Sequence, residues 1–206
     1  MSCFGNSGCR KGGCIVKRWY DYLWIFSAAY MISGFFNILF AWVGLICFIT
    51  PLLLSIMGKG KIYCNSYCGR GQLFELLGSR LKLSSNRNIP AFIRSKWFRY
   101  GFLAFFMIMF SIMIFSTYLV FNGTKNLEEA ITLLWTIKLP WNWAYTGKVS
   151  PWIAQFAFGF YSVMLTSTIL GMITMFFFKP RSWCVYCPMG TMTQAISILK
   201  YGRKMR

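Results

Sequence analysis

The sequence predicts an all-α integral membrane protein with four transmembrane helices in two pseudo-repeated halves. Three observations lead to this prediction. The 206-residue chain is 57% hydrophobic and only 13% charged, its apolar residues fall in runs long enough to span a bilayer, and a short cysteine-containing segment occurs twice. Each half is expected to end in a cysteine-pair motif followed by an interfacial helix.

The apolar runs predict the number of spans. The first region, residues 19–57, is far longer than one crossing, because a helix rises ~1.5 Å per residue and the hydrocarbon core is ~30 Å thick. It must contain two full spans, or one span and a re-entrant segment. Ser33, Gly34 and Asn37 mark the expected turn. The expected spans are about 19–36, 38–57, 98–121 and 152–178.

The positive charges predict the orientation. The chain has 22 Lys and Arg residues against four acids, a net charge of +18. All but three of the basic residues lie before the first span, from the end of the second span to the start of the third, or beyond the fourth. The connection 122–151 holds the exceptions. Positive residues border spans on the cytoplasmic side, which predicts a cytoplasmic-membrane protein whose motifs face the cytoplasm. This topology explains the charge without nucleic-acid binding.

The connection 122–151 is rich in aromatic residues. Its second half contains Trp135, Trp141, Trp143 and Tyr145. Trp and Tyr collect at membrane–water interfaces, so this segment is expected to lie along the outer interface as a structural anchor.

The repeated segments are residues 63–75 and 183–194. Each has an aromatic residue before the first cysteine, and a basic segment follows an apolar span in both cases. After the second cysteine each is expected to form a short amphipathic helix, and Gly69 and Pro188 suit the turn that begins it. The equivalent positions are Cys64 with Cys184, Cys68 with Cys187, Tyr67 with Tyr186, Gly71 with Gly190, and Glu75 with Gln194.

Two cysteine pairs on one membrane face provide four soft ligands. A Cys₄ set binds either an iron–sulfur cluster or a zinc ion, and the same thiols could instead be a redox-active dithiol or remain as thiols. The chain has no histidine and only four carboxylates, which excludes His-ligated haem, carboxylate-bridged metal centres and His-based acid–base catalysis. Neighbouring basic residues would offset the thiolate charge, namely Lys59, Lys61, Arg70, Lys179 and Arg181.

The doubled Cys-x₂₋₃-Cys-[Gly/Pro]-x-Gly pattern, each copy after an apolar span, resembles the membrane iron–sulfur proteins of the NapH/NosR type. The resemblance covers roughly residues 40–80 and 155–200. It implies that Cys64, Cys68, Cys184 and Cys187 bind a [4Fe-4S] cluster and that the protein transfers electrons to or from redox enzymes. The chain departs from that family at Gly69, where proline is usual, and it lacks the ferredoxin module of many relatives.

The remaining cysteines carry weaker signals. Cys3, Cys9 and Cys14 lie in a flexible basic head, residues 1–18, which precedes the membrane domain 19–206. Their spacing matches no metal motif, so thiols are the default interpretation, and a second cluster with an outside ligand is the alternative. Cys47, within the second expected span, is expected to be a small packing residue.

Two functions are consistent with the sequence. The leading hypothesis is a membrane-bound electron-transfer protein with one [4Fe-4S] cluster, a component of a redox complex rather than a stand-alone enzyme, because no catalytic residues are recognisable. Its basic face would attract an acidic carrier such as a ferredoxin or flavodoxin, and a membrane redox partner would complete the circuit. The alternative is a non-catalytic redox or metal sensor or an assembly factor with a Cys₄ zinc or dithiol site.

Overall fold

The computed structural model describes residues 22–57, 64, 67–85, 87–134, 136–145 and 149–201, and it is mostly helical, at 75%. Cys3, Cys9 and Cys14 lie outside the described residues, as do Lys59 and Lys61. The elements in chain order are α1 (Leu23–Phe36), η2 (a 3₁₀ helix, Ile38–Trp42), α2 (Val43–Ile56), α3 (Gly69–Glu75), η4 (a π-helical turn, Leu76–Arg80), α4 (Ala91–Arg94), α5 (Lys96–Phe121), β1 (Ala130–Leu133), β2 (Ile137–Pro140), η5 (a 3₁₀ helix, Asn142–Ala144), α6 (Pro151–Phe177), α7 (Trp183–Tyr186) and α8 (Pro188–Tyr201).

Three helical segments are long and apolar enough to cross a membrane. They are Ile38–Ile56, which joins η2 to α2, Lys96–Phe121 and Pro151–Phe177. Each coincides closely with an expected span. The fold is therefore compatible with a membrane protein, and the three segments supply the apolar length that a bilayer requires.

The first expected span is shorter in the structure than in the prediction. Helix α1 has 14 residues, fewer than the ~20 that a crossing needs, and residues 19–21 lie outside the described part. The turn after it is where the sequence predicts. Asn37 is extended (φ −141°, ψ 113°), and its Oδ1 accepts a hydrogen bond from the Leu39 N–H at 3.0 Å, which caps the start of η2.

Helix α6 is the central helix of the bundle. Half of the residues in its most apolar stretch are buried, whereas only 22% are buried in the corresponding stretch of α5. Gly34 of α1 lets the two helices approach closely, because a Cβ there would overlap the ring of Tyr161 on α6. The Tyr161 hydroxyl donates to the Met31 carbonyl of α1 at 2.9 Å. Small residues at such crossings are how apolar helices pack without a hydrophobic driving force.

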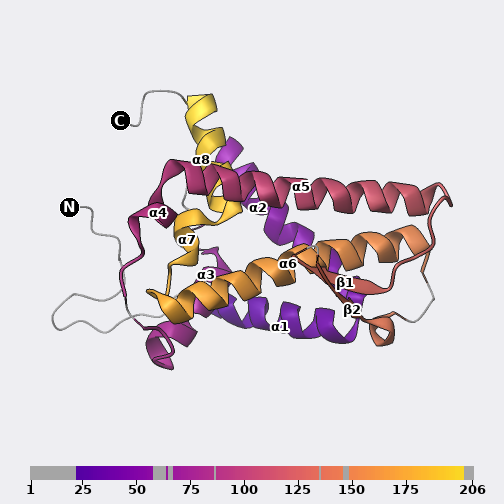
Figure 1. Cartoon of the computed structure of the whole chain (residues 1–206), viewed down its shortest axis with the longest axis horizontal. Coiled ribbons are helices and arrows are strands. Elements are labelled where there is room, and N and C mark those ends of the chain that lie inside the picture. The colour runs from indigo at the N-terminus through magenta and orange to yellow at the C-terminus, as the bar shows by residue number, and fades with distance from the viewer. Residues whose placement is uncertain are drawn as a thin grey trace.

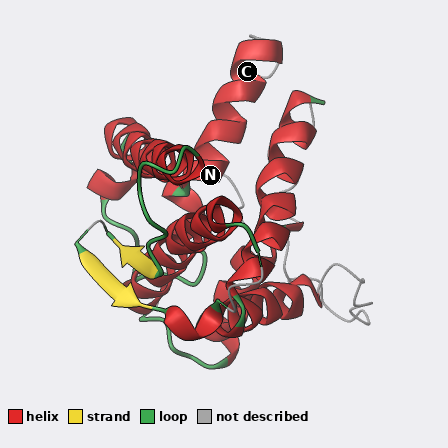
Figure 2. Ribbon diagram, turned by 90° about the vertical axis from the view of Figure 1, so that its right-hand side faces the viewer, coloured by secondary structure: helices red, strands yellow, loops and turns green. Residues whose placement is uncertain are grey.

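The expectation of an all-α chain missed a short β-hairpin. Strands β1 and β2 pair antiparallel, with Ala130 opposite Pro140 and Leu133 opposite Ile137. Figure 2 shows both strands at one edge of the helix bundle. The hairpin forms because the segment can bury Ile131, which is fully buried against α6 and η2 in one apolar cluster.

The aromatic segment after the hairpin folds onto the helices rather than lying along an interface throughout. Trp141 is buried, and its Nε1–H donates to the Phe35 carbonyl at 3.2 Å. Trp143 remains exposed, and Trp135 lies outside the described residues. Before the hairpin, the Glu128 N–H donates to Gln155 Oε1 of α6 at 3.0 Å. The connection is therefore attached to α6 before the hairpin and to α1 after it.

The short helices gather at the opposite end of the bundle. Figure 1 shows α3, α4, α7 and α8 at one end of the long helices, with the hairpin toward the other. Helix α3 packs against α1 and α6, and helix α8 packs against α2 and α5. The Ser55 hydroxyl of α2 donates to the Thr193 carbonyl of α8 at 2.7 Å.

The Gly34 contact can be tested with a matched glycine. We expect Gly34→Ala to destabilise the chain by about 1–3 kcal/mol through overpacking against Tyr161. Gly101 on α5 has nothing within 4 Å of its Cβ position, so Gly101→Ala should be neutral or raise stability by up to about 1 kcal/mol. Thermal unfolding in detergent measures both. Equal midpoints for the two variants would contradict the close crossing of α1 and α6.

Candidate metal centre

The four motif cysteines lie at the end of the bundle where the short helices gather. Cys68 immediately precedes α3 and is its N-cap residue. Cys184 lies within α7, and Cys187 separates α7 from α8. Cys64 is half-buried, in a stretch whose neighbours Asn65 and Ser66 are not described. The second cysteine of each pair thus stands directly before a helix, as the repeated pattern predicts.

The sulfurs of the two pairs converge around two glycines. An ideal Cβ at Gly71 would lie 3.5 Å from Cys184 Sγ and 3.7 Å from Cys68 Sγ, so these two sulfurs are no farther apart than the sum of those distances. An ideal Cβ at Gly190 would lie 4.0 Å from Cys64 Sγ and 4.0 Å from Cys187 Cβ. Each glycine therefore faces a sulfur from the other motif. The fold brings all four cysteines to one place.

A single metal ion and an iron–sulfur cluster require different spacings of the same four sulfurs. A structural zinc ion needs four sulfurs about 2.3 Å from one centre. Within the described ranges, which include all four motif cysteines, no group of three or more Cys, Asp or Glu side chains is arranged to hold a single metal ion. Gly71 and Gly190 leave open the space between the thiols that a side chain would otherwise occupy.

The helix after Cys187 directs hydrogen-bond donors at its sulfur. Burial raises the pKa of Cys187, and the backbone N–H groups of Gly190 and Met189, which donate to its side chain, offset part of that rise. Pro188 opens the helix, and its missing N–H costs nothing at that position. The N-terminal end of a helix carries a partial positive charge, which stabilises an anionic sulfur.

Burial has the opposite effect on the thiols. It raises the pKa of Cys187 above the ordinary value of 9.0, despite those hydrogen bonds. It also raises the pKa of Cys184 well above that value, and the neighbouring Cys68 and Cys187 raise it further. Cys184 is exposed as a whole residue, but its sulfur faces inward toward Gly71. Grouped thiols of this kind release their protons to solvent when a metal centre binds their sulfurs, because metal binding and deprotonation are coupled.

Arg70 brings positive charge to the centre from inside the bundle. Its Nη1 donates to Ser167 Oγ at 2.6 Å and its Nη2 to Met164 Sδ at 3.0 Å, both on α6. Its charge lowers the pKa of Cys187. The other motif arginine, Arg181, instead forms an ion pair with Glu75 of α3. Both arginines were expected to offset thiolate charge, but nothing in the sequence indicated that Arg70 would reach α6 or that Arg181 would pair with Glu75.

An aromatic cluster holds the two motifs together. Phe74 of α3 is fully buried, and a Cβ at Gly171 of α6 would lie 2.5 Å from its ring. Trp183 and Tyr186 of α7 are buried in the same cluster, with Tyr186 centred 5.0 Å from Phe102 of α5. Burial raises the pKa of Tyr186 to about 12, so it stays protonated. This packing positions α3 and α7 with respect to each other.

The same two parts of the chain match a known family. The family model described as a 4Fe-4S binding domain matches residues 40–90 and 162–206, which contain all four motif cysteines. The cofactor of this chain is a [4Fe-4S] cluster. Comparison with curated proteins and with solved structures gave no match.

The residues present fit this cofactor. Iron–sulfur clusters are held by cysteine thiolates, and the structure gathers four cysteines with two glycines between them. Cys47 is on α2 and exposed, away from this group. The contact of Phe74 with Gly171, which supports the site, was not predicted from the sequence. The signal that could have indicated it is Gly171 itself, because a glycine within an apolar span lets a neighbouring helix come close.

Gly71→Ala tests the space between the thiols. The new Cβ would meet the two sulfurs at ordinary van der Waals distances, so the apo chain should fold as the wild type does. The methyl group would occupy space beside Cys184 and Cys68, and we expect cluster affinity to fall on the order of tenfold. Iron per chain after reconstitution measures this, with Gly101→Ala as the control. Full iron content in Gly71→Ala would contradict the assignment of this space.

Proposed function

We propose that this chain is an integral membrane electron-transfer protein in which one [4Fe-4S] cluster is held jointly by Cys64, Cys68, Cys184 and Cys187. The observation that carries the proposal is the meeting of two motifs that are distant in sequence, with Cys184 Sγ and Cys68 Sγ both within 3.7 Å of one position at Gly71. Two ligands from each motif make the four that a cubane cluster needs. The NapH/NosR resemblance points to the same four residues.

The proposed location is the cytoplasmic membrane, with the cluster on the cytoplasmic face. Three helices of spanning length support embedding in a bilayer, and α1 would be the fourth crossing. Nearly all of the basic residues lie in the N-terminal head, in the segment between the second and third spans and in the segment after the fourth. Such residues stay on the cytoplasmic side. A re-entrant α1 is the alternative, in keeping with its 14 residues.

The contacts between helices support two repeated halves. In the first half α3 packs against α1 and also against α6 of the second half. In the second half α8 packs against α5 and also against α2 of the first half. Each helix that follows a cysteine pair therefore contacts the first long helix of its own half and the second of the other. This exchange is what a pseudo-two-fold arrangement around one shared site requires.

The chain's own residues have distinct parts in this function. The four cysteines hold the cofactor, and Gly71 and Gly190 leave room for it. Arg70 and the backbone N–H groups of Met189 and Gly190 offset negative charge on the Cys187 sulfur. When bound, a [4Fe-4S] cluster supplies one-electron transfer, and local charge and hydrogen bonds set its reduction potential. We therefore expect a component of a redox complex rather than a stand-alone enzyme.

The charge of the chain favours exchange of electrons with an acidic soluble carrier. The segments that we propose to face the cytoplasm carry far more basic than acidic residues, so a carrier such as a ferredoxin or flavodoxin would be steered toward them. A membrane redox partner would take the electron onward.

Serine substitutions test whether the cluster is shared. We expect Cys68→Ser and Cys187→Ser each to abolish nearly all bound iron and sulfide, because removing one ligand leaves an incomplete Cys₄ set. Cys47→Ser is the matched control, since Cys47 lies on α2 away from the motifs, and it should keep the wild-type content. Anaerobic iron, sulfide and zinc assays, with EPR of the reduced protein, measure the outcome.

Each alternative gives a different result in this assay. Half the iron in each single variant would mean one site per motif and would contradict a shared cluster. One zinc per chain without iron or sulfide would replace electron transfer by the structural or sensory function. Thiols without any metal would favour a dithiol sensor.

Arg70 is expected to raise the reduction potential. Arg70→Gln removes a cation close to Cys187, so reduction, which adds negative charge, becomes less favourable. The midpoint reduction potential of the cluster should become more negative by tens of millivolts. For one electron, a tenfold change in the equilibrium constant for reduction corresponds to ~59 mV. Arg70→Lys should recover part of the shift, and Arg80→Gln, at an exposed position beyond α3, is the control. Redox titration followed by EPR measures all three. Equal shifts for Arg70→Gln and Arg80→Gln would contradict this role.

A further inference from the structure

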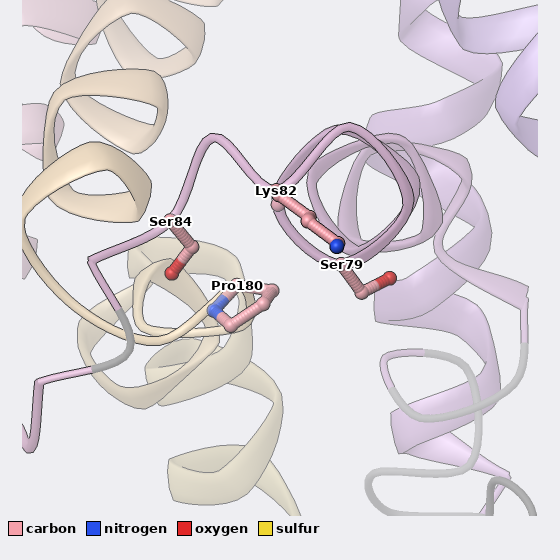
Figure 3. Close-up of a pocket in the computed structure, with 5 residues that line it drawn as sticks. Ser79, Lys82, Ser84 and Pro180 are labelled. Carbon is pink, nitrogen blue, oxygen red and sulfur yellow. The ribbon is translucent and has the colours of Figure 1, made fainter.

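A pocket of about 270 Å³ lies beside the cysteine motifs but does not contain them. It is lined by Gly78, Ser79, Lys82, Ser84 and Pro180. Figure 3 shows Ser84 and Pro180 on one side of the hollow and Lys82 and Ser79 on the other. The pocket lies where the two halves meet, since a Cβ at Gly78 would lie 2.8 Å from Pro180.

The pocket offers one cation and two hydrogen-bond acceptors. The Ser79 hydroxyl donates to the Glu75 carbonyl, and the Ser84 hydroxyl donates to the Phe178 carbonyl. Because both hydroxyl protons are used in these bonds, either oxygen can bind a ligand only as an acceptor. Lys82 adds an ammonium group with three donors. A complementary ligand therefore carries an anionic acceptor for Lys82 and hydrogen-bond donors for the serines.

The charge of Lys82 is available to such a ligand. Glu75, the carboxylate nearest in sequence, is paired with Arg181. The other ion pairs found in the described part of the chain join Glu128 to Lys125 and Lys138, on the connection that carries the hairpin. Lys82 also has a left-handed backbone (φ 51°), which is uncommon for a residue with a side chain.

The pocket opens at the level where α6 ends. The segment after η4 is joined to that end by a hydrogen bond from the Ser85 N–H to the Phe176 carbonyl at 3.1 Å. Leu81, Leu83 and Phe177 beside the pocket are 58%, 42% and 63% exposed. Apolar side chains around a cationic pocket at the end of a long apolar helix suit the boundary between acyl chains and headgroups.

We propose that this pocket binds the headgroup of an anionic phospholipid, of which phosphatidylglycerol has the matching chemistry. Its phosphate accepts from Lys82, and its glycerol hydroxyls donate to the oxygens of Ser79 and Ser84. Its acyl chains lie against Leu81, Leu83 and Phe177. The site rests on the membrane location proposed above. Since Gly78 and Pro180 belong to different halves, a lipid bound here supports the contact between the two cysteine motifs.

Native mass spectrometry of the full-length, cluster-loaded protein tests this site. The protein in detergent is titrated with phosphatidylglycerol, with phosphatidylcholine of the same acyl chains, and with soluble glycerol phosphate. We expect one retained phosphatidylglycerol and little of the others, because choline has no donor for the serines and glycerol phosphate has no acyl chains. Lys82→Gln should weaken phosphatidylglycerol binding about fivefold, the effect of one cation near an anionic headgroup.

The controls separate this site from general attraction to a basic protein. Arg87→Gln removes an exposed cation from the same segment, outside the pocket, and should leave binding unchanged. The double change Ser79→Ala and Ser84→Ala should reduce the preference for phosphatidylglycerol over phosphatidylcholine. Equal loss in Lys82→Gln and Arg87→Gln, or equal binding of the two lipids, would overturn the proposal. Tight binding of glycerol phosphate alone would replace the lipid by a soluble phosphate ester.

Two further measurements distinguish failure of this site from failure of the proposed function. Iron content and EPR are recorded on the same samples. An intact cluster without lipid preference overturns the lipid site alone, and a lipid preference in a protein that binds no iron supports the lipid site while overturning electron transfer. Release of the chain from membranes by alkaline carbonate would overturn the membrane location and the lipid site together.

Discussion

The packing of α3 against α6 is the contact on which the rest of the site depends. Phe74 inserts against Gly171, and Gly78 meets Pro180 in the segment that leads from α6 to the second motif. These contacts bring Cys68, which precedes α3, near Cys184, which follows α6. Closing a chain over so many residues costs conformational entropy, which the buried aromatic rings around Trp183 help to offset. Without the contacts of Phe74 with Gly171 and of Gly78 with Pro180, nothing would hold the two cysteine pairs beside each other.

Electrostatics imposes a second constraint, because the chain has few acids with which to balance its cations. The pair of Arg181 with Glu75 uses one of only four carboxylates. Arg70, hydrogen-bonded to Ser167 and Met164, is left to face the thiols. A half-buried cation and a group of thiols that must become thiolates are each unfavourable alone, and together they compensate each other. The charges around the thiols therefore come from both motif regions, as the proposed ligand set does.

Much of the site could be anticipated because its chemistry is local in the sequence. A cysteine before Gly69 and another before Pro188 are recognisable from the residues themselves, since a helix start depends on its nearest neighbours. The break at Asn37 was likewise predictable from a residue type that caps helices. The hairpin was not, because Ile131 is a strand residue only through its burial against α6 and η2. The burial of Trp141 was not predictable either, because its indole N–H bonds to the Phe35 carbonyl, and that partner is distant in the sequence.

The amino-acid sequence alone predicted the helical, apolar class of the protein, the approximate positions of the long apolar helices and the four candidate cysteine ligands, because hydrophobic runs and paired cysteines are properties of short segments. Tertiary structure alone decided which arginine reaches the thiols, which glycines admit a neighbouring ring, and that Lys82 lines a pocket at the junction of the halves. The physical reason is that each of these depends on a side chain from a distant part of the polypeptide. No local preference specifies such a partner until the helices are packed together.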